Sequence, residues 1–324
     1  MKGDVEFIMY YIGVDMGGTK IAVGIVNEKG DIISKDSIPT YRERGYEEVV
    51  KDMGLLILRL IKAQKLFVSD FEYIGIGLPG SINKKDGILI YANNFGYHNA
   101  PIADELRKYI DLPVFLENDA NCAALAENVA GAAIGTQNSI TITLGTGVGG
   151  GIVVGGKVYS GFNDAAGEIG HTVILSDGKE CTCGRKGCWE VYASATGLIA
   201  QTKRAAFKNP ESLINTLVKG NLDNIDAKTA FDAEREGDKT GSQVVEQYIK
   251  YIAEGIIDLI NIFTPEVLVV GGGVSKEGEN LLGRLKKIVY DNIYFKGEPK
   301  TKILEAKMGN DAGIIGAAMI GREG

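Results

Sequence analysis

The chain of 324 residues is long enough for two domains, and its 45% hydrophobic and 24% charged residues are ordinary for a globular protein. Its net charge of −7 argues against nucleic acid as a partner, and no apolar run is long enough for a membrane-spanning helix. The N-terminus is charged and has no apolar signal core, so we expect a cytoplasmic protein without a membrane partner.

The chain begins, after a leader of residues 1–8, with a pattern that returns later. Residues 10–38 predict three strands, separated by a glycine turn and then a tight turn. Residues 139–160 repeat this scheme. We interpret the pair as an internal duplication, in which two similar halves each present a glycine loop toward a shared cleft.

Helical and strand patterns alternate between and after these two segments, which indicates an α/β fold. The apolar spacing predicts helices at residues 46–66, 101–110, 120–130, 243–262, 277–290 and 311–321, with further helical pattern across 193–254. Short apolar runs predict strands at residues 73–78, 114–116, 267–270 and 303–306.

Each repeated segment carries a glycine-rich turn that suits a phosphate. The first is Asp15–Lys20, and the second is Leu144–Gly147. Glycines let backbone N–H groups approach phosphate oxygens, and a carboxylate at a strand end can hold magnesium through water. Either turn alone is explained as a hairpin, but at matching positions they indicate a nucleotide clamp. A third glycine run, Gly271–Gly273, offers a flat surface for a nucleoside.

Asp119 follows a predicted strand and precedes a predicted helix. Catalytic groups are commonly found at such a position in an open α/β sheet. An aspartate there is equally well explained as a helix N-cap. The local sequence leaves both interpretations open.

A metal site is predicted by His171, Cys181, Cys183 and Cys188, which lie within eighteen residues. One imidazole and three thiolates form a complete tetrahedral zinc set. The whole chain has two histidines and four cysteines, so their concentration here is unlikely to be accidental. A disulfide and free thiols are the alternatives, but three cysteines do not pair evenly. A closed set of four protein ligands indicates a structural zinc rather than a catalytic one.

Two glutamates flank the predicted metal ligands. Glu168 lies three residues before His171, and Glu190 lies two residues after Cys188. Zinc occupies one imidazole nitrogen and leaves the other free. Fixed carboxylates and an imidazole suit a ligand rich in hydroxyl groups. The alternative for each glutamate is a solvated surface charge.

Together these motifs resemble the ROK family (repressor, open reading frame, kinase) of sugar kinases, within the actin-like ATPase superfamily. The resemblance covers residues 11–321. Its motifs are VDMGGTK and LGTGVGGG for phosphate, GIGLPG for a substrate loop, ENDANCAALAE for a catalytic segment, and GEIGH with CTCGRKGCWE for zinc. The ASATG that follows is similar to the glucokinase branch.

The resemblance implies a duplicated, ribonuclease H-like α/β fold with two domains around a cleft. A small N-terminal domain would span residues 1–118, with the C-terminal helix at about 306–324 packing back on it. A large domain carrying the zinc loop would span residues 119–305.

The resemblance also implies roles for individual residues. Asp119 would be the general base that accepts the proton of the sugar 6-hydroxyl. The residues expected to bind sugar hydroxyls are Asn94, Asn118, Glu168, His171 and Glu190. Asp15 would organise magnesium, and the residues expected around ATP are Gly17, Gly18, Thr19, Lys20, Gly145, Thr146, Gly147, Gly271 and Gly272.

The implied reaction is transfer of phosphate from ATP to the 6-hydroxyl of D-glucose. One departure affects the choice of sugar, because the family glucokinases usually carry tryptophan where this chain has Tyr97. Asn93 and Asn94 are adjacent, and we favour Asn94 as the sugar contact. Another hexose kinase (for N-acetylglucosamine, N-acetylmannosamine, mannose or allose) and a sugar sensor without turnover are the alternatives. The resemblance further implies a homodimer or homotetramer.

Overall fold

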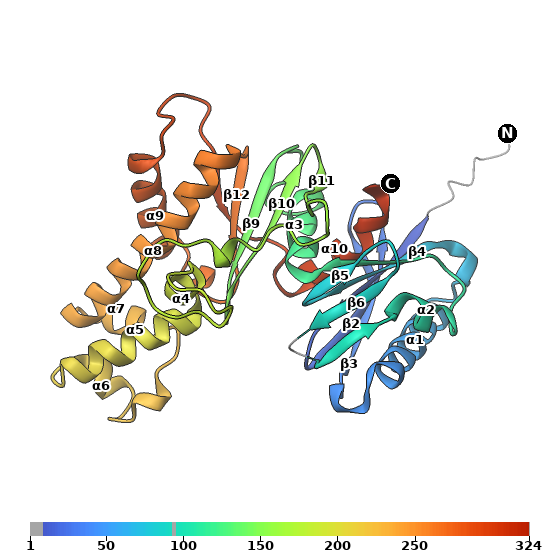
Figure 1. Ribbon diagram of the computed structural model, residues 1–324, viewed down its shortest axis with the longest axis horizontal. Coiled ribbons are helices and arrows are strands. Elements are labelled where there is room, and N and C mark those ends of the chain that lie inside the picture. Colours follow the sequence, from blue (N-terminus) through green and yellow to red (C-terminus); the bar gives the residue numbers. More distant parts are fainter. Residues whose placement is uncertain (1–8, 93–94, 324) are drawn as a thin grey trace. The chain divides into compact units, whose positions relative to one another are not determined.

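The computed structural model describes residues 9–92 and 95–323, and the chain divides into two compact units (Figure 1). The first unit contains the chain up to Ser139, then Gly151–Gly167, and finally the chain from Lys307 onward. The second unit contains Ile140–Gly150 and Glu168–Ala306. The C-terminal segment therefore belongs to the first unit. The boundary between a small domain of residues 1–118 and a large domain of residues 119–305 stays a prediction.

The sheet of the first unit has five strands in the order β3-β2-β1-β4-β8. Strands β1, β2 and β3 pair antiparallel, whereas β4 runs parallel to both β1 and β8. The strands are β1 (Tyr10–Met16), β2 (Lys20–Asn27), β3 (Ile32–Pro39), β4 (Phe71–Leu78) and β8 (Val114–Asn118).

A second five-stranded sheet repeats this order as β11-β10-β9-β12-β13. Its hairpin strands, β10 and β11, are antiparallel, and its last pair, β12 and β13, is parallel. The strands are β9 (Ser139–Leu144), β10 (Val148–Val154), β11 (Lys157–Val158), β12 (Val267–Gly271) and β13 (Lys302–Glu305). The matching strand orders confirm the predicted duplication and the α/β fold class.

A smaller, three-stranded antiparallel sheet in the first unit was not predicted. It has the order β5-β6-β7, formed by β5 (Ser81–Asn83), β6 (Ile88–Ala92) and β7 (Tyr97–Ala100). These strands are short, and the apolar run in β6 is interrupted by exposed residues. Their pattern is therefore too brief to show the period of a strand.

The helices of the first unit are α1 (Tyr46–Ala63), α2 (Ile102–Arg107), α3 (Asp119–Val129) and α10 (Ala312–Met319). Helix α1 buries one apolar face, which includes Val50, Met53 and Ile57, and it packs on β2 and β3. This spacing of three and four residues is the pattern that predicted the helix. The observed helix begins where it was predicted, at residue 46, and ends three residues before the predicted end at residue 66.

Helix α10 lies directly on the sheet because glycines remove the side chains between them. Gly13 on β1 pairs with Gly24 on β2 and with Gly75 on β4, so the three form a row across the sheet. A Cβ atom at Gly13 would lie 1.9 Å from the carbonyl oxygen of Ile314, and one at Gly75 would lie 1.8 Å from that of Ala317. The backbone of α10 therefore occupies the space where side chains would otherwise lie.

The second unit contains six described α-helices, mostly around the long helix α8 (Figure 1). Asp238 caps α8 by accepting a hydrogen bond from the Gly241 N–H group, so the helix begins four residues before the prediction. The helices are α4 (Glu190–Ala193), α5 (Ala195–Lys208), α6 (Leu213–Leu217), α7 (Thr229–Arg235), α8 (Lys239–Phe263) and α9 (Glu279–Asn292).

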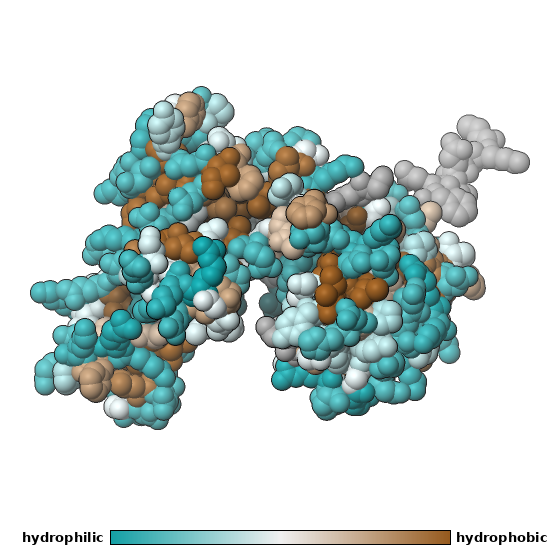
Figure 2. Space-filling model, viewed as in Figure 1, coloured by the Kyte–Doolittle hydropathy of each residue, from teal (hydrophilic) through white to brown (hydrophobic). Residues whose placement is uncertain are grey.

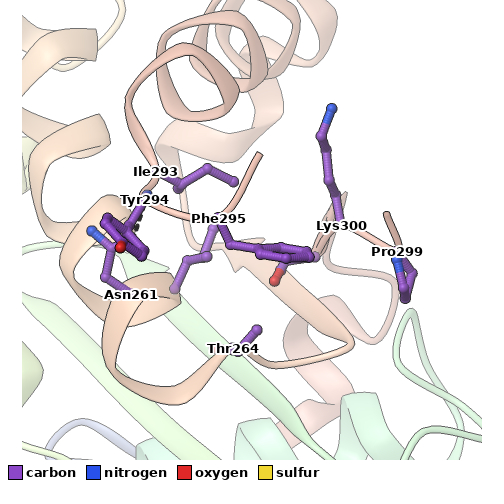
Figure 3. A pocket seen from close by; sticks show the side chains of 9 residues that line it. Asn261, Thr264, Ile293, Tyr294, Phe295, Pro299 and Lys300 are labelled. Carbon is purple, nitrogen blue, oxygen red and sulfur yellow. Dashed lines mark hydrogen bonds between the residues drawn. The ribbon is translucent and has the colours of Figure 1, made fainter. Parts of the chain in front are cut away.

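The segment between α9 and β13 folds over the C-terminal end of α8 and encloses a small pocket (Figure 3). The Tyr294 N–H group donates a hydrogen bond to Asn261 on α8 at 2.9 Å, and the side chain of Ile293 is buried. Elsewhere in this unit, the visible face over α5 to α7 is mainly hydrophilic (Figure 2). No helix in the described parts of the chain is both long and apolar enough to cross a membrane.

We predict that Gly316→Ala destabilises the first unit. A Cβ at Gly316 would lie 1.8 Å from the carbonyl oxygen of Cys122, so α10 would have to move away from α3. Overpacking of this kind costs about 1–3 kcal/mol, and a clash with rigid backbone belongs at the upper end. Urea unfolding followed by circular dichroism measures the change.

Gly283→Ala on α9 is the matched control. Its Cβ would meet only the end of the flexible Glu279 side chain, at 3.2 Å. The substitution should be neutral or stabilise by about 0.5–1 kcal/mol, because alanine has the higher helix propensity. Equal stability of the two variants would contradict the proposed backbone contact.

Candidate active site and metal centre

The C-terminal end of β8 carries three consecutive polar residues with different roles in the fold. Asn118 is the N-cap of α3, and its side-chain oxygen accepts a hydrogen bond from the Ala120 N–H group at 2.9 Å. Asp119 is the first residue of the helix, and its Oδ1 atom accepts from the same N–H group at 2.8 Å. The cap interpretation therefore belongs to Asn118, and Asp119 Oδ2 is free of hydrogen bonds within the described residues.

The carboxylate of Asp119 has an environment that suits a proton acceptor. The residue is exposed to solvent, yet the protein atoms around its carboxylate partly desolvate that group and raise its pKa, and hydrogen bonds from the backbone oppose this effect. Burial also raises the pKa of Asp15 at the end of β1, and the negative charge of Asp119 raises it further. The two strand-end carboxylates are thus close enough to interact electrostatically. A general base is most effective when its pKa is near the working pH, and the raised pKa of Asp119 is closer to neutral pH than that of an ordinary aspartate.

Glu117, the residue before this pair, was not identified from the sequence. It is 3% exposed, and its Oε1 atom accepts hydrogen bonds from the Asn118 N–H group and from the Asn121 side chain. The ammonium of Lys84, from the segment after β5, forms an ion pair with Glu117 and a hydrogen bond with Ser160. The pair fixes the strand end beside Asp119.

The pKa of the buried Cys122 thiol is shifted by its burial and by the charges around it. Burial raises its pKa well above the ordinary value. The carboxylates of Glu117, Asp119 and Asp15 raise it further, while the Lys84 ammonium lowers it. Lys84 is thus the cation paired with Glu117, next to the carboxylates of Asp119 and Asp15. The order of charged residues in the sequence did not predict this ion pair, because Lys84 and Glu117 are distant in the chain.

The first glycine loop joins β1 to β2 and is closed by its own backbone. The Gly17 N–H group donates to the Lys20 carbonyl at 2.9 Å, and the Thr40 hydroxyl donates to the Gly17 carbonyl at 2.6 Å. Thr19 and Lys20 are exposed, and Lys20 lowers the pKa of Asp15. The loop therefore has a hydrogen-bonded backbone and an exposed cation beside a carboxylate.

The second glycine loop contacts the N-terminus of α5. The Gly145 carbonyl accepts from the Ala195 N–H group at 2.8 Å, and the Thr146 carbonyl accepts from the Thr196 hydroxyl at 2.7 Å. A Cβ at Gly145 would meet no atom within 4 Å. The open space at Gly145 and the nearby helix N-terminus are both features of phosphate sites. Their use here remains a prediction.

The third glycine run packs against this loop. Gly272 has a positive φ of 91°, and a Cβ there would lie 2.4 Å from the Leu144 carbonyl oxygen. A Cβ at Gly271 would lie 3.1 Å from Ala306. Packing thus explains the requirement for glycine at 272, and contact of Gly271 and Gly272 with a nucleoside remains a prediction.

The predicted metal ligands converge. The ligand atoms of His171, Cys181, Cys183 and Cys188 all lie within 4.8 Å of one another. Cys183 Sγ lies 3.6 Å from Cys188 Sγ, and Cys181 Sγ lies 3.6 Å from His171 Nδ1. Zinc–sulfur bonds of about 2.3 Å in a tetrahedron place ligands about 3.8 Å apart, so the cluster fits a zinc site. Burial raises the pKa of Cys188 to about 12, and metal binding would therefore release its proton.

The geometry also identifies the free nitrogen of the imidazole. Since Nδ1 of His171 faces the sulfur atoms, Nε2 points elsewhere. Glu168 is exposed and its carboxylate makes no hydrogen bond within the described residues. Glu190 accepts a hydrogen bond from the Val148 N–H group at 3.0 Å, which ties it to the strand after the second glycine loop.

The zinc loop is attached to α8 through Trp189, which is fully buried. Its indole N–H group donates to the Tyr251 carbonyl at 2.7 Å, and a Cβ at Gly255 would lie 2.2 Å from its ring. Lys179, on the same loop, lies 5.4 Å above the Tyr192 ring. Burial, and then the charge of Arg204, lower the pKa of Lys179.

The predicted sugar contact Asn94 and its neighbour Asn93 lie outside the described residues. Tyr97 is 7% exposed, and its ring stacks on Phe95 with centroids 5.4 Å apart. Its hydroxyl donates to the Arg42 carbonyl at 2.9 Å. Tyr97 is thus a packing residue of the first unit.

Comparison with known proteins identifies a family. The sequence matches the ROK family over residues 11–323. It is 39% identical over 316 residues to a glucokinase of Thermotoga maritima, which covers 96% of this chain and 97% of that protein.

Two solved structures are similar along the whole chain. One is a ROK family glucokinase from Streptomyces griseus in complex with glucose and AMPPNP (36% identity, TM-score 0.79, 97% of this chain and 100% of that one). The other is a ROK hexokinase from Thermus thermophilus (33% identity, TM-score 0.84, 98% and 100%).

We predict that Cys183→Ser loses zinc. Changes to residues that only support a metal ligand weaken affinity about 10–100-fold, and loss of a ligand should exceed that. Metal analysis after treatment with a chelator measures zinc content. The emission of Trp189, the chain's single tryptophan, should change because it adjoins Cys188.

Cys122→Ala is the control, since this fourth cysteine is buried on α3 and is not one of the clustered ligands. It should keep one zinc per chain. Stoichiometric zinc in Cys183→Ser after chelation would rule out this residue as a ligand.

We predict that Lys84→Met destabilises the first unit and lowers turnover. The change leaves Glu117 buried without its cation, and such a loss costs about 3 kcal/mol. Adding Glu117→Gln should recover part of the stability, because no charge then remains unpaired. Urea unfolding and steady-state rates measure both effects.

Lys85→Met is the matched control, because Lys85 is adjacent and exposed. It should change stability by less than about 0.5 kcal/mol. If Lys84→Met behaves like Lys85→Met, the ion pair does not fix the strand end.

Proposed function

The chain belongs to the ROK family, and we propose that it is a glucokinase that uses ATP to phosphorylate the 6-hydroxyl of D-glucose. The observation that carries this proposal is Asp119, a carboxylate with a raised pKa and a free oxygen at the end of a sheet strand. The similarity to two glucokinases over nearly the whole chain supports the choice of sugar.

In the proposed reaction, Asp119 accepts the proton of the sugar hydroxyl as that oxygen attacks the terminal phosphorus of ATP. Phosphoryl transfer depends mainly on positioning and on electrostatic stabilisation. Asn118 caps α3 and so sets the direction in which Asp119 leaves the helix. The Lys84–Glu117 pair keeps this strand end in one conformation.

The glycine loops have the proposed role of binding ATP. Residues 17–20 and 145–147 would offer backbone N–H groups and the Lys20 ammonium to phosphate oxygens. Magnesium, when bound near Asp15, would supply positive charge that neutralises the phosphates. Gly271 and Gly272 would lie beside the nucleoside.

The zinc loop has the proposed role of binding the sugar. Glu168 and Glu190 would accept hydrogen bonds from sugar hydroxyls, and His171 would use its Nε2 atom. Asn94 and Asn118 would bind further hydroxyls. Zinc itself is proposed to be structural, since all four of its ligands come from the protein. The cytoplasmic location and the homodimer or homotetramer expected from the sequence remain predictions.

The alternatives are another hexose kinase and a sugar sensor. A coupled ADP-release assay with ATP, magnesium and a panel of hexoses separates them. The panel contains glucose, mannose, allose, fructose and the two N-acetylated hexosamines. Strong turnover of glucose supports the proposal, and preference for another sugar would retain the kinase but overturn the glucokinase assignment. Absence of turnover in zinc-loaded protein would favour the sensor.

We predict that Asp119→Asn lowers kcat by about 10²–10⁴-fold while sugar binding is retained. A group whose pKa is raised by folding destabilises the protein once it is ionised, so the variant should be at least as stable as the parent at pH 7. In the parent, kcat/KM should fall on the acid side at a higher pH than the usual aspartate pKa of about 3.9.

Asp111→Asn is the control, because Asp111 is exposed on the segment before β8. It should leave the rate and the pH profile unchanged. Retained turnover in Asp119→Asn would remove this residue as the base.

A further inference from the structure

A basic pocket lies in the second unit, between the zinc loop, α5 and α8. Its volume is about 310 Å³. Three basic residues, Lys179, Arg204 and Lys208, line it, together with the polar residues Thr240, Gln243 and Gln247. We call this the α5–α8 pocket. None of the described residues that line it is acidic.

The three cations are placed without a counter-charge. Arg204 and Lys208 lie four residues apart on α5, so they share one face of the helix, where like charges destabilise it. Within residues 9–92 and 95–323, none of the three forms an ion pair. Lys203 on the same helix, in contrast, pairs with Asp223 at 2.9 Å. The chain as a whole is acidic, with a net charge of −7, so three uncompensated cations around one cavity are not explained by composition.

We propose that the α5–α8 pocket binds a phosphate-bearing metabolite of about the size of a sugar phosphate. A cavity of this volume is at the lower end of small-ligand sites. A phosphate dianion would relieve the repulsion among the cations, and Arg204 can bind it through two N–H groups. The glutamine side chains on α8 can hydrogen-bond the hydroxyls of the same ligand.

The pocket is connected to the zinc loop through Lys179. Its N–H group donates to the Tyr192 hydroxyl at 2.6 Å, and its carbonyl accepts from the Gly187 N–H group at 2.8 Å. Gly187 directly precedes Cys188, and Tyr192 lies in the short helix that begins at Glu190. A ligand that binds the Lys179 side chain would therefore also affect the loop that carries the proposed sugar-binding carboxylates.

The first test is direct binding of inorganic phosphate, and then of a hexose 6-phosphate, by isothermal titration calorimetry at constant ionic strength. The proteins are the zinc-loaded parent, Arg204→Gln/Lys208→Gln, and the control Lys203→Gln. The control removes one positive charge from α5 outside the pocket, and its exposed ion pair contributes little to stability. Any phosphate bound at the glycine loops contributes equally to all three proteins.

We expect the double variant to weaken binding at least about tenfold, whereas Lys203→Gln binds like the parent, because each charge-assisted hydrogen bond is worth about this factor. A larger loss of affinity in the double variant for the hexose phosphate than for phosphate would identify the organic ligand, and equal losses would identify phosphate alone. Equal affinities in the parent and the double variant, or no saturable binding by the parent, would overturn the proposal.

The second test is the sugar KM with and without phosphate. It should shift in the parent and in Lys203→Gln but not in the double variant. This readout rests on the proposed kinase function, whereas the binding measurement does not. Binding without turnover would therefore retain the pocket and overturn only the kinase assignment. A KM shift of equal size in the double variant would overturn the connection to the zinc loop.

Discussion

The first unit depends on close contact between the backbones of α10 and the sheet beneath it. Gly24, Gly13 and Gly75 lie side by side on β2, β1 and β4, and their lack of side chains lets α10 lie on the strands. Gly316 permits the same approach to α3 on another face of α10. The C-terminal helix thus packs on both the strand that carries Asp15 and the helix that begins at Asp119. Because the contacts are between backbones, the positions of these carboxylates depend little on flexible side chains.

The two units place their polar groups by different means. In the first, the ion pair between Lys84 and the buried Glu117 and the helix-cap hydrogen bond of Asn118 fix the end of β8. In the second, the Cys and His cluster ties the loop together, and Trp189 attaches it to α8. A short glycine-rich loop has little apolar area to bury, so coordination can order it where packing cannot. An ion pair suffices in the first unit because its strand is already held by the sheet.

The sequence predicted features that depend on local pattern or on rare residue types. The duplicated strands, the long helices and the zinc ligands belong to this group, because period and composition are visible in one chain. It did not predict β5 to β7, whose strands are too short to show a period. It also attributed glycine mainly to ligand loops, whereas Gly13, Gly75 and Gly316 serve helix packing. That role depends on residues more than 190 positions away in the chain. Asn118 and Asp119 are both good N-cap residues, so only the structure could assign the cap.

Tyr97 shows how a sequence difference near a proposed sugar loop can act indirectly. Its ring is stacked on Phe95 and meets the edge of Tyr46, with centroids 6.3 Å apart. Its hydroxyl holds the Arg42 carbonyl, a bond that an indole in the same place would have to make with different geometry. Tryptophan is also larger, and buried sites resist added volume. The exchange of tryptophan for tyrosine therefore alters packing beneath β7, directly after residues 93–94. Any effect on the choice of sugar would act through the packing of β7 rather than through a contact of the buried Tyr97 with the ligand.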